Sequence, residues 1–111
     1  MPSCSHIGIG LQCAMRIIAK RTLRKFWKNH PDAEGPLRAW HQEALRAKWP
    51  NPHEIKAQHR NASVIQRGRV VFNIAGNKYR LVVKINYAYG IVYVRFIGTH
   101  RQYDQIDVET I

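Results

Sequence analysis

The stretch from Arg69 to Asp104, RVVFNIAGNKYRLVVKINYAYGIVYVRFIGTHRQYD, decides the fold. From Tyr79 to Tyr87 every odd position is apolar or aromatic, whereas most even positions are polar. This period of two predicts a strand with one face in the core and one face toward solvent. A similar alternation precedes it at 70–74, and a β-branched and aromatic run follows it at 91–97. The sequence therefore predicts three successive strands.

Two short connections predict that these strands pair in antiparallel order. Ala75-Gly76-Asn77 and Ala88-Tyr89-Gly90 supply the Gly and Asn residues that tight turns with positive φ require. If the odd positions of the middle strand face the core, its cations project together from the opposite face. We expect this group to contain Lys78, Arg80 and Lys84, with Arg95 beside them.

Two titratable rings, His100 and Tyr103, come directly after the last of these strands. A cationic sheet face with His and Tyr at its rim can hold a phosphate and move a proton. An ordinary role is also open for each side chain. Lys84 is better explained as a solvated surface residue, and Tyr103 packs at a sheet edge as readily as it takes part in chemistry.

The composition indicates one domain with an anionic partner. The chain has 111 residues, a net charge of +11 and a pI near 10.3, which favours nucleic acid, an anionic membrane or an acidic protein as partner. No run reaches the ~18 apolar residues that a spanning helix needs. Cys4 and Cys13 are too few for a disulfide scaffold, and with His6 they lack the paired spacing of zinc ligands. We expect a cytoplasmic protein with free thiols, no metal and no membrane.

The N-terminus differs in composition from the rest of the chain. Residues 1–14 contain no Lys, Arg, Asp or Glu, and Met15 then opens the strand-like run Met15–Ala19. A basic segment followed by a compact apolar core, the mark of a signal peptide, is not present. We expect that Met15 is the natural start, that residues 1–14 are an extension or poorly ordered, and that residues 15–111 form the domain.

Helices are predicted between the N-terminal strand and the sheet. Lys20–His30 and Pro36–Ala47 both carry apolar residues at helical spacing, so they predict a helical hairpin. Asn51 and Pro52 suit the cap and first position of a short third helix, His53 to about Arg60. A further strand is expected at Ser63–Gln66, with a turn at Arg67-Gly68.

The aromatic and histidine residues of the helices have simple structural interpretations. Trp27, Trp40 and Trp49 fall on or beside apolar stripes, so we expect them in the core. His30 and His41 are expected on helix surfaces. The acidic residues from Asp104 onward predict a C-terminal segment that packs against the body of the domain or lies along a basic surface. The predicted fold class is α+β: an antiparallel sheet of about four strands plus an N-terminal strand, packed against an N-terminal helical hairpin.

Several blocks of sequence resemble the HigB family of bacterial type II toxins, which has the RelE-like fold. These blocks are Ile55–Gln58, Arg69–Ile74, Gly76–Leu81 and Gly98-Thr99-His100-x-x-Tyr103-Asp104. Their order and spacing make the resemblance specific, and it extends over Met15–Ile111.

The resemblance implies a ribosome-dependent endoribonuclease that cuts mRNA in the decoding site without a metal or cofactor. In this chemistry the 2′-hydroxyl of RNA attacks the adjacent phosphate, leaving a cyclic phosphate and a 5′-hydroxyl. The resemblance also implies an antitoxin of the HigA type, with a helix-turn-helix, that neutralises the toxin. Operator DNA is then bound only through the toxin–antitoxin complex.

The resemblance also assigns candidate site residues. Arg80 matches the strand arginine that RelE-like toxins use for phosphate, and His100 and Tyr103 match the position of an acid or base, with the two roles left open between them. The basic helix 20–30 is interpreted as a surface for the ribosome or the antitoxin. The candidate RNA-binding residues are Lys56, His59, Arg60, Lys78, Arg95 and Arg101.

Two other functions are compatible with the sequence. A noncatalytic basic RNA-binding module needs only the positive charge and predicts salt-sensitive binding without turnover. A toxin of the same fold that inhibits a DNA gyrase predicts DNA damage instead of shortened transcripts.

Overall fold

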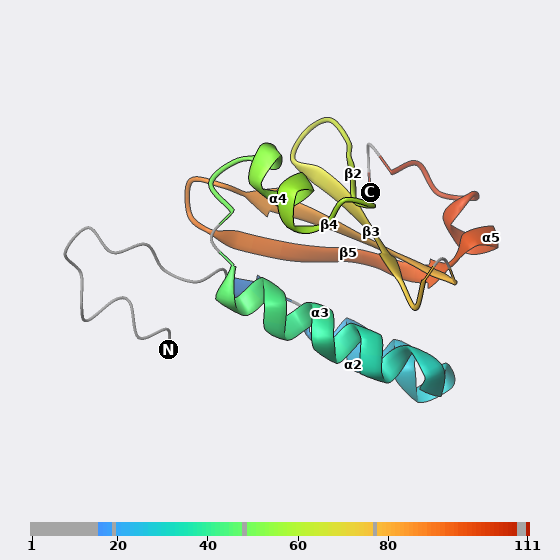
Figure 1. Cartoon of the computed structure of the whole chain (residues 1–111). Helices are drawn as coiled ribbons and strands as arrows, with labels where there is room; N and C mark the ends of the chain where they lie inside the picture. Colours follow the sequence, from blue (N-terminus) through green and yellow to red (C-terminus); the bar gives the residue numbers. More distant parts are fainter. Residues whose placement is uncertain (1–15, 19, 48, 77, 109–110) are drawn as a thin grey trace.

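The computed structural model describes residues 16–18, 20–47, 49–76, 78–108 and 111. The expectations for residues 1–14, Met15 and the cysteines lie outside these residues. In chain order (Figure 1) the elements are β1 (Arg16–Ile18), α2 (Lys20–Asn29), the 3₁₀ turn η1 (Pro31–Ala33), α3 (Glu34–Arg46), α4 (Pro52–Gln58), β2 (Ser63–Val64), β3 (Arg69–Ile74), β4 (Tyr79–Asn86), β5 (Ile91–Thr99) and α5 (His100–Tyr103).

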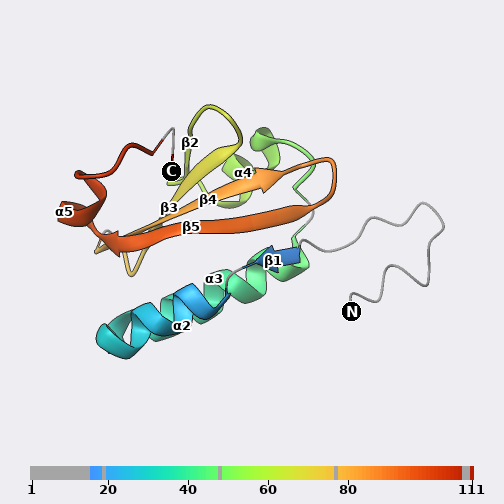
Figure 2. The ribbon, with the colours of Figure 1, turned by 180° about the vertical axis from the view of Figure 1, so that it is seen from behind.

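The five strands form one mixed sheet in the order β1-β5-β4-β3-β2. The strands from β2 to β5 are antiparallel neighbours, whereas β1 pairs with β5 in parallel. Figures 1 and 2 show α2 and α3 running together along one side of the sheet, with α5 at the far end of β5. This arrangement confirms the predicted α+β fold with its N-terminal helical hairpin and added N-terminal strand.

The predicted turns occur where glycine allows positive φ. Arg67 and Gly68 have φ of 63° and 76° in the turn between β2 and β3, and Ala75 and Gly76 have φ of 55° and 70° after β3. Gly68 is also required by a close approach, because a Cβ there would lie 2.9 Å from the main-chain oxygen of Ile85. Two positive φ values in succession suit the twist of a hairpin.

One face of the sheet packs on the helices and forms the main core. The odd positions of β4 that we predicted to face inward are all buried in this core, from Leu81 at 0 % exposed to Ile85 at 4 %. Burying a side chain of this size stabilises the fold by roughly 1.5–3 kcal/mol. The three tryptophans lie in the same core, as predicted: Trp27, Trp40 and Trp49.

The expectation that His41 lies on a helix surface is wrong. His41 is only 7 % exposed, on the side of α3 that packs inward. Burial lowers the pKa of His41 below its usual 6.5, and the positive charges of Lys20 and Arg24 lower it further. The burial of His41 was not predicted because a polar residue next to an apolar helix position such as Trp40 is usually exposed to solvent. His30 is also more enclosed than expected, since its ring stacks on Phe26 at 4.2 Å.

We expect the free energy of unfolding to fall as the pH is lowered from 7 to 5. Burial lowers the pKa of both His41 and His59 below 6.5, so in this range the unfolded chain binds more protons than the folded one. Stability from these groups is complete above pH 6.5 and is lost below it. Urea unfolding at several pH values measures the slope, which His41→Gln and His59→Gln should both flatten. An unchanged slope in the double variant would contradict the assignment.

An irregularity in β5 sets which residues share a face with Arg80. Val83 pairs with Val94, whereas Val82 pairs with Phe96, so Arg95 is an extra residue that forms a bulge. The bulge reverses the alternation along β5. Without it, Gly98 would face the helices, but with it Gly98 lies opposite Arg80 on the outer face of the sheet.

The C-terminal segment covers part of this outer face. Figure 1 shows the chain after α5 returning toward β2 and β3. The main-chain oxygen of Ile111 accepts hydrogen bonds from Nη2 and Nε of Arg69, at 2.7 and 3.1 Å. Val71 and Val82, which point to the outer face, are 1 % and 0 % exposed. The prediction that this segment packs against the domain is confirmed.

Candidate active site

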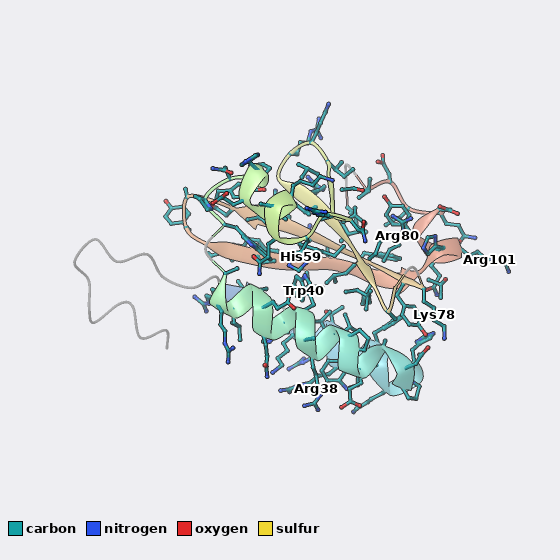
Figure 3. The ribbon with its side chains drawn as sticks, viewed as in Figure 1. Arg38, Trp40, His59, Lys78, Arg80 and Arg101 are labelled. Atoms are coloured by element: carbon teal, nitrogen blue, oxygen red, sulfur yellow. The ribbon has the colours of Figure 1, made fainter. Side chains whose placement is uncertain are left out.

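Three candidate catalytic side chains meet at one end of the sheet. Arg80 projects from β4 on the face opposite the helical hairpin (Figure 3), and its Nε donates to Nε2 of His100 at 3.3 Å. The guanidinium carbon of Arg80 lies 5.2 Å from the centre of the Tyr103 ring. His100 and Tyr103 both come from α5, and all three side chains remain partly exposed. The structure thus brings together a permanent cation, an imidazole and a phenol.

A capping box holds the single turn of α5 that carries both rings. The hydroxyl of Thr99 accepts from the main-chain N–H of Gln102 at 3.2 Å, and Oε1 of Gln102 accepts from the main-chain N–H of Thr99 at 2.9 Å. This reciprocal pair satisfies two N–H groups that a helix start leaves free. Because Thr99 is the last residue of β5, the box fixes α5 directly to the strand next to Arg80.

Gly98 makes room for this turn. It pairs with Arg80 across the sheet, and a Cβ at this position would lie 2.6 Å from Oε1 of Gln102 and 2.7 Å from Cζ of Phe96. Contacts below 3.0 Å force a neighbour to move. The absent side chain therefore lets Gln102 fold back over the strand and complete the capping box.

We expect Gly98→Val to lower activity about tenfold or more while the domain still folds. The new side chain displaces Gln102, opens the capping box and shifts His100 and Tyr103 away from Arg80; loss of a cap alone costs about 1 kcal/mol of stability. Toxicity on induction and the melting temperature of the purified protein are the measurements. Gly35→Ala is the matched control, because a Cβ at Gly35 meets nothing within 4 Å. Wild-type activity in Gly98→Val would show that the position of α5 is unimportant.

The expectation that Lys78 projects with Arg80 is wrong. The Lys78 ammonium bonds to Oδ2 of Asp32 in η1, and the Tyr79 hydroxyl donates to Oδ1 of the same carboxylate at 2.7 Å. These two bonds lower the pKa of Asp32 below its usual 3.8. Figure 3 shows Lys78 toward the helix end, away from Arg80. The alternation of β4 does not predict the direction of the Lys78 side chain, because Lys78 lies in the turn before β4 begins at Tyr79.

Arg95 lies on the expected face, next to Lys84. It lines a depression of about 310 Å³ with Lys84, Asn86 and Tyr93. Lys84 is four residues along β4 from Arg80, which corresponds to about 13 Å of strand. The bulge at Arg95 was not predicted, because it arises only from the pairing of β5 with β4. Arg101, by contrast, lies on α5 and projects into solvent (Figure 3).

The candidates from the third helix lie at the edge of β3. The Lys56 ammonium donates to the main-chain oxygens of Ala62 at 2.8 Å and Arg60 at 3.1 Å, so it holds the loop after α4. The ring of His59 packs edge-on against Phe72, with centroids 5.1 Å apart. Burial lowers the pKa of His59, and Oε2 of Glu43, 3.5 Å away, opposes that change. Arg60 is exposed.

Asn73 lies near the site but was not predicted from the sequence as a site residue. Asn73 pairs with Arg80 across β3 and β4, so the two side chains share the outer face. The signal was present in the alternation of 70–74, which makes Asn73 the polar position of its strand. In the part of the chain that the structure describes, no three His, Cys, Asp or Glu side chains cluster as metal ligands do. Within that same part, no helix is both long and apolar enough to cross a bilayer.

Comparison with known proteins places the chain in a family. No curated protein matches it. The HigB_toxin family model, described as the RelE-like toxic component of a toxin-antitoxin system, matches residues 33–106. This match is well over half of the chain, and it includes α3, the strands β2 to β5 and the three side chains that meet on α5 and β4. The chain therefore belongs to the HigB toxin family, the RelE-like toxic components of toxin-antitoxin systems.

Proposed function

We propose that this toxin is a ribosome-dependent endoribonuclease that cleaves mRNA during translation. The observation that carries this proposal is the meeting of Arg80, His100 and Tyr103 on a partly exposed sheet face. RNA cleavage at a phosphodiester needs a base, an acid and a fixed positive charge. These three side chains can supply all three functions.

The reaction that fits this set uses the RNA's own 2′-hydroxyl as nucleophile. Arg80 binds the nonbridging oxygens of the scissile phosphate and stabilises the charge that develops on them. A bond forms between the 2′-oxygen and phosphorus while the bond from phosphorus to the 5′-oxygen breaks. The 2′ proton goes to the base, and the departing 5′-oxygen takes a proton from the acid. The products are a 2′,3′-cyclic phosphate and a 5′-hydroxyl.

The hydrogen bond between Arg80 and His100 favours one assignment of the base and the acid. Nε2 of His100 is the acceptor in its contact with Nε of Arg80, and a ring nitrogen that accepts a hydrogen bond can also accept a proton. A neutral imidazole can begin the reaction as the base. The hydroxyl of Tyr103 can donate a proton, so we assign Tyr103 as the acid.

The open shape of the site supports dependence on the ribosome. Arg80 lies on a sheet face and the two rings lie on the single turn of α5, all partly exposed, so few protein groups can fix the 2′-oxygen in line with the leaving 5′-oxygen. Alignment of the reacting groups contributes several kcal/mol to such reactions. We propose that the ribosome holds the codon in position, and that a HigA-type antitoxin neutralises the toxin in the bacterial cytoplasm, with operator DNA bound only by the pair.

Induction in a bacterial host, followed by primer extension on an abundant mRNA, tests this function. We expect cuts in phase with codons that disappear in His100→Ala and Tyr103→Phe. Toxicity with intact transcripts and damaged DNA would instead support inhibition of a gyrase. Salt-sensitive RNA binding without any cut would support a noncatalytic module.

A further inference from the structure

We infer that a polar pocket at the edge of β3 binds a nucleobase of the RNA next to the phosphate held by Arg80. This inference rests on the proposed function and extends it to base selection. The pocket has a volume of about 240 Å³ and lies between the loop after α4 and β3. Its lining includes His59, Arg60, Asn61, Phe72 and Asn73.

Asn73 connects this pocket to the candidate active site. It pairs directly with Arg80, and side chains paired in this way have Cβ atoms about 4.5–5.5 Å apart on one face. A group bound against Asn73 is therefore a neighbour of a phosphate bound by Arg80. In RNA, the groups next to a phosphate are the sugar and base of the flanking nucleotides.

The free edge of β3 supplies main-chain groups to the pocket. β2 is antiparallel to β3 and begins at Ser63, which pairs with Val71, while Val64 pairs with Val70. From Phe72 onward, therefore, β2 does not continue alongside β3. The oxygen of Arg69 accepts from the N–H of Ile65 on the β2 side at 2.8 Å. Because main-chain groups alternate along a strand, those of Asn73 face the same side, beyond the first residue of β2.

The Asn73 amide has unused hydrogen-bonding capacity. Its Oδ1 is buried without a hydrogen-bond partner in the part of the chain that the structure describes. Its Nδ2 donates only a long bond, 3.4 Å, to the main-chain oxygen of Asn61. A buried amide acceptor left unpaired costs roughly 1–3 kcal/mol. A small reorientation of this side chain would exchange the long bond for a pair of bonds to a ligand.

The chemistry of the pocket favours a base over a second phosphate. The Lys56 ammonium is already bonded to the oxygens of Ala62 and Arg60, which follow α4. Of the described side chains that line the pocket, Arg60 is the one that carries a permanent positive charge. What remains is an amide and a strand edge that offer both donors and acceptors, as base edges do. The volume is below the roughly 300–1,000 Å³ of sites for drug-sized ligands, which suits a single ring system.

Cleavage by Asn73→Leu tests the inference, because leucine keeps the size of the side chain but cannot form hydrogen bonds. Single-turnover cleavage rates are measured on ribosome-bound mRNAs that carry each of the four bases at each position of the codon. We expect the wild-type protein to prefer certain bases at one position, and Asn73→Leu to reduce that preference about tenfold, since a bidentate contact to a base gives ~1–3 kcal/mol of discrimination. Rates on the disfavoured bases should not change.

Gln42→Leu, an exposed position on α3, is the matched control and should retain the full preference. Two results would overturn the inference. One is an unchanged preference in Asn73→Leu. The other is an equal slowing on all bases, which would mean that Asn73 acts on the phosphate or on the fold.

A binding experiment separates this inference from the proposed function. The ¹⁵N-labelled wild-type protein is titrated by NMR with the four nucleoside 5′-monophosphates and with ribose 5-phosphate. We expect the amides of Asn73 and Gly76 to shift with at least one nucleotide but not with ribose 5-phosphate, and the shifts to vanish in Asn73→Leu. If these shifts occurred but the protein cleaved no RNA, the base-binding pocket would be supported and the proposed nuclease function would be contradicted. Equal shifts with ribose 5-phosphate, or none at millimolar concentration, would contradict the pocket.

Discussion

Arg80→Met is expected to reduce mRNA cleavage at least about 100-fold and to abolish toxicity. The guanidinium is a permanent charge that contacts both rings of the site, at 3.3 Å from Nε2 of His100 and 5.2 Å from the Tyr103 ring centre. Removing one donor that faces developing negative charge costs roughly 2.7–4 kcal/mol. Methionine keeps the length of the side chain and removes its charge, so this variant isolates the electrostatic contribution.

The domain should remain folded in Arg80→Met. Arg80 is partly exposed on the outer face of β4 and is not in the core, so the melting temperature should change little. Arg46→Met, an exposed position in the last turn of α3, removes the same charge far from the site. It should cleave at the wild-type rate. Arg80→Met with wild-type activity would mean that the phosphate binds elsewhere.

His100→Ala is expected to slow cleavage by about 100- to 10,000-fold, the usual range for loss of a general acid or base. The capping box between Thr99 and Gln102 does not involve the His100 side chain, so α5 should persist. Single-turnover cleavage of ribosome-bound mRNA measures the effect. Partial recovery on adding free imidazole would show that a proton acceptor, and not a structural contact, was removed.

His53→Ala is the matched control for His100→Ala. His53 is exposed on α4, on a different part of the chain from α5. It should cleave normally, with or without added imidazole. If His100→Ala retained wild-type cleavage, the base would have to be another group, and the assignment of Tyr103 as the acid would fail with it.

Much of the fold was predictable because one strong pattern controlled it. The period of two at 79–87 placed Tyr79, Leu81, Val83 and Ile85 in the core, and once one face is buried the register of a strand is fixed. The capping residue Asn51 was also readable from sequence, since its side chain accepts from the N–H of Glu54 as predicted. Local patterns of this kind act over a few residues.

The features that escaped prediction depend on contacts between distant residues. The bulge at Arg95 exists only in the pairing of β5 with β4, and it places Gly98 opposite Arg80. Lys78 was predicted from alternation, but its position depends on Asp32, which is 46 residues earlier in the chain. Asn73 became a candidate only when the register placed it opposite Arg80. The meeting of Arg80 with the two rings was expected from the order of the strands, but it depends on the β4–β5 register, with its bulge, as well as on the capping box that ties α5 to the end of β5.

A double-mutant cycle tests most directly whether Arg80 and His100 act on one phosphodiester. Single-turnover cleavage of ribosome-bound mRNA is measured for the wild-type protein, Arg80→Met, His100→Ala and the double variant. Groups that act together on one transition state have strongly non-additive effects. We predict that the double variant is about as slow as the slower single variant. Losses that multiply, or no cleavage by the wild-type protein, would contradict the account.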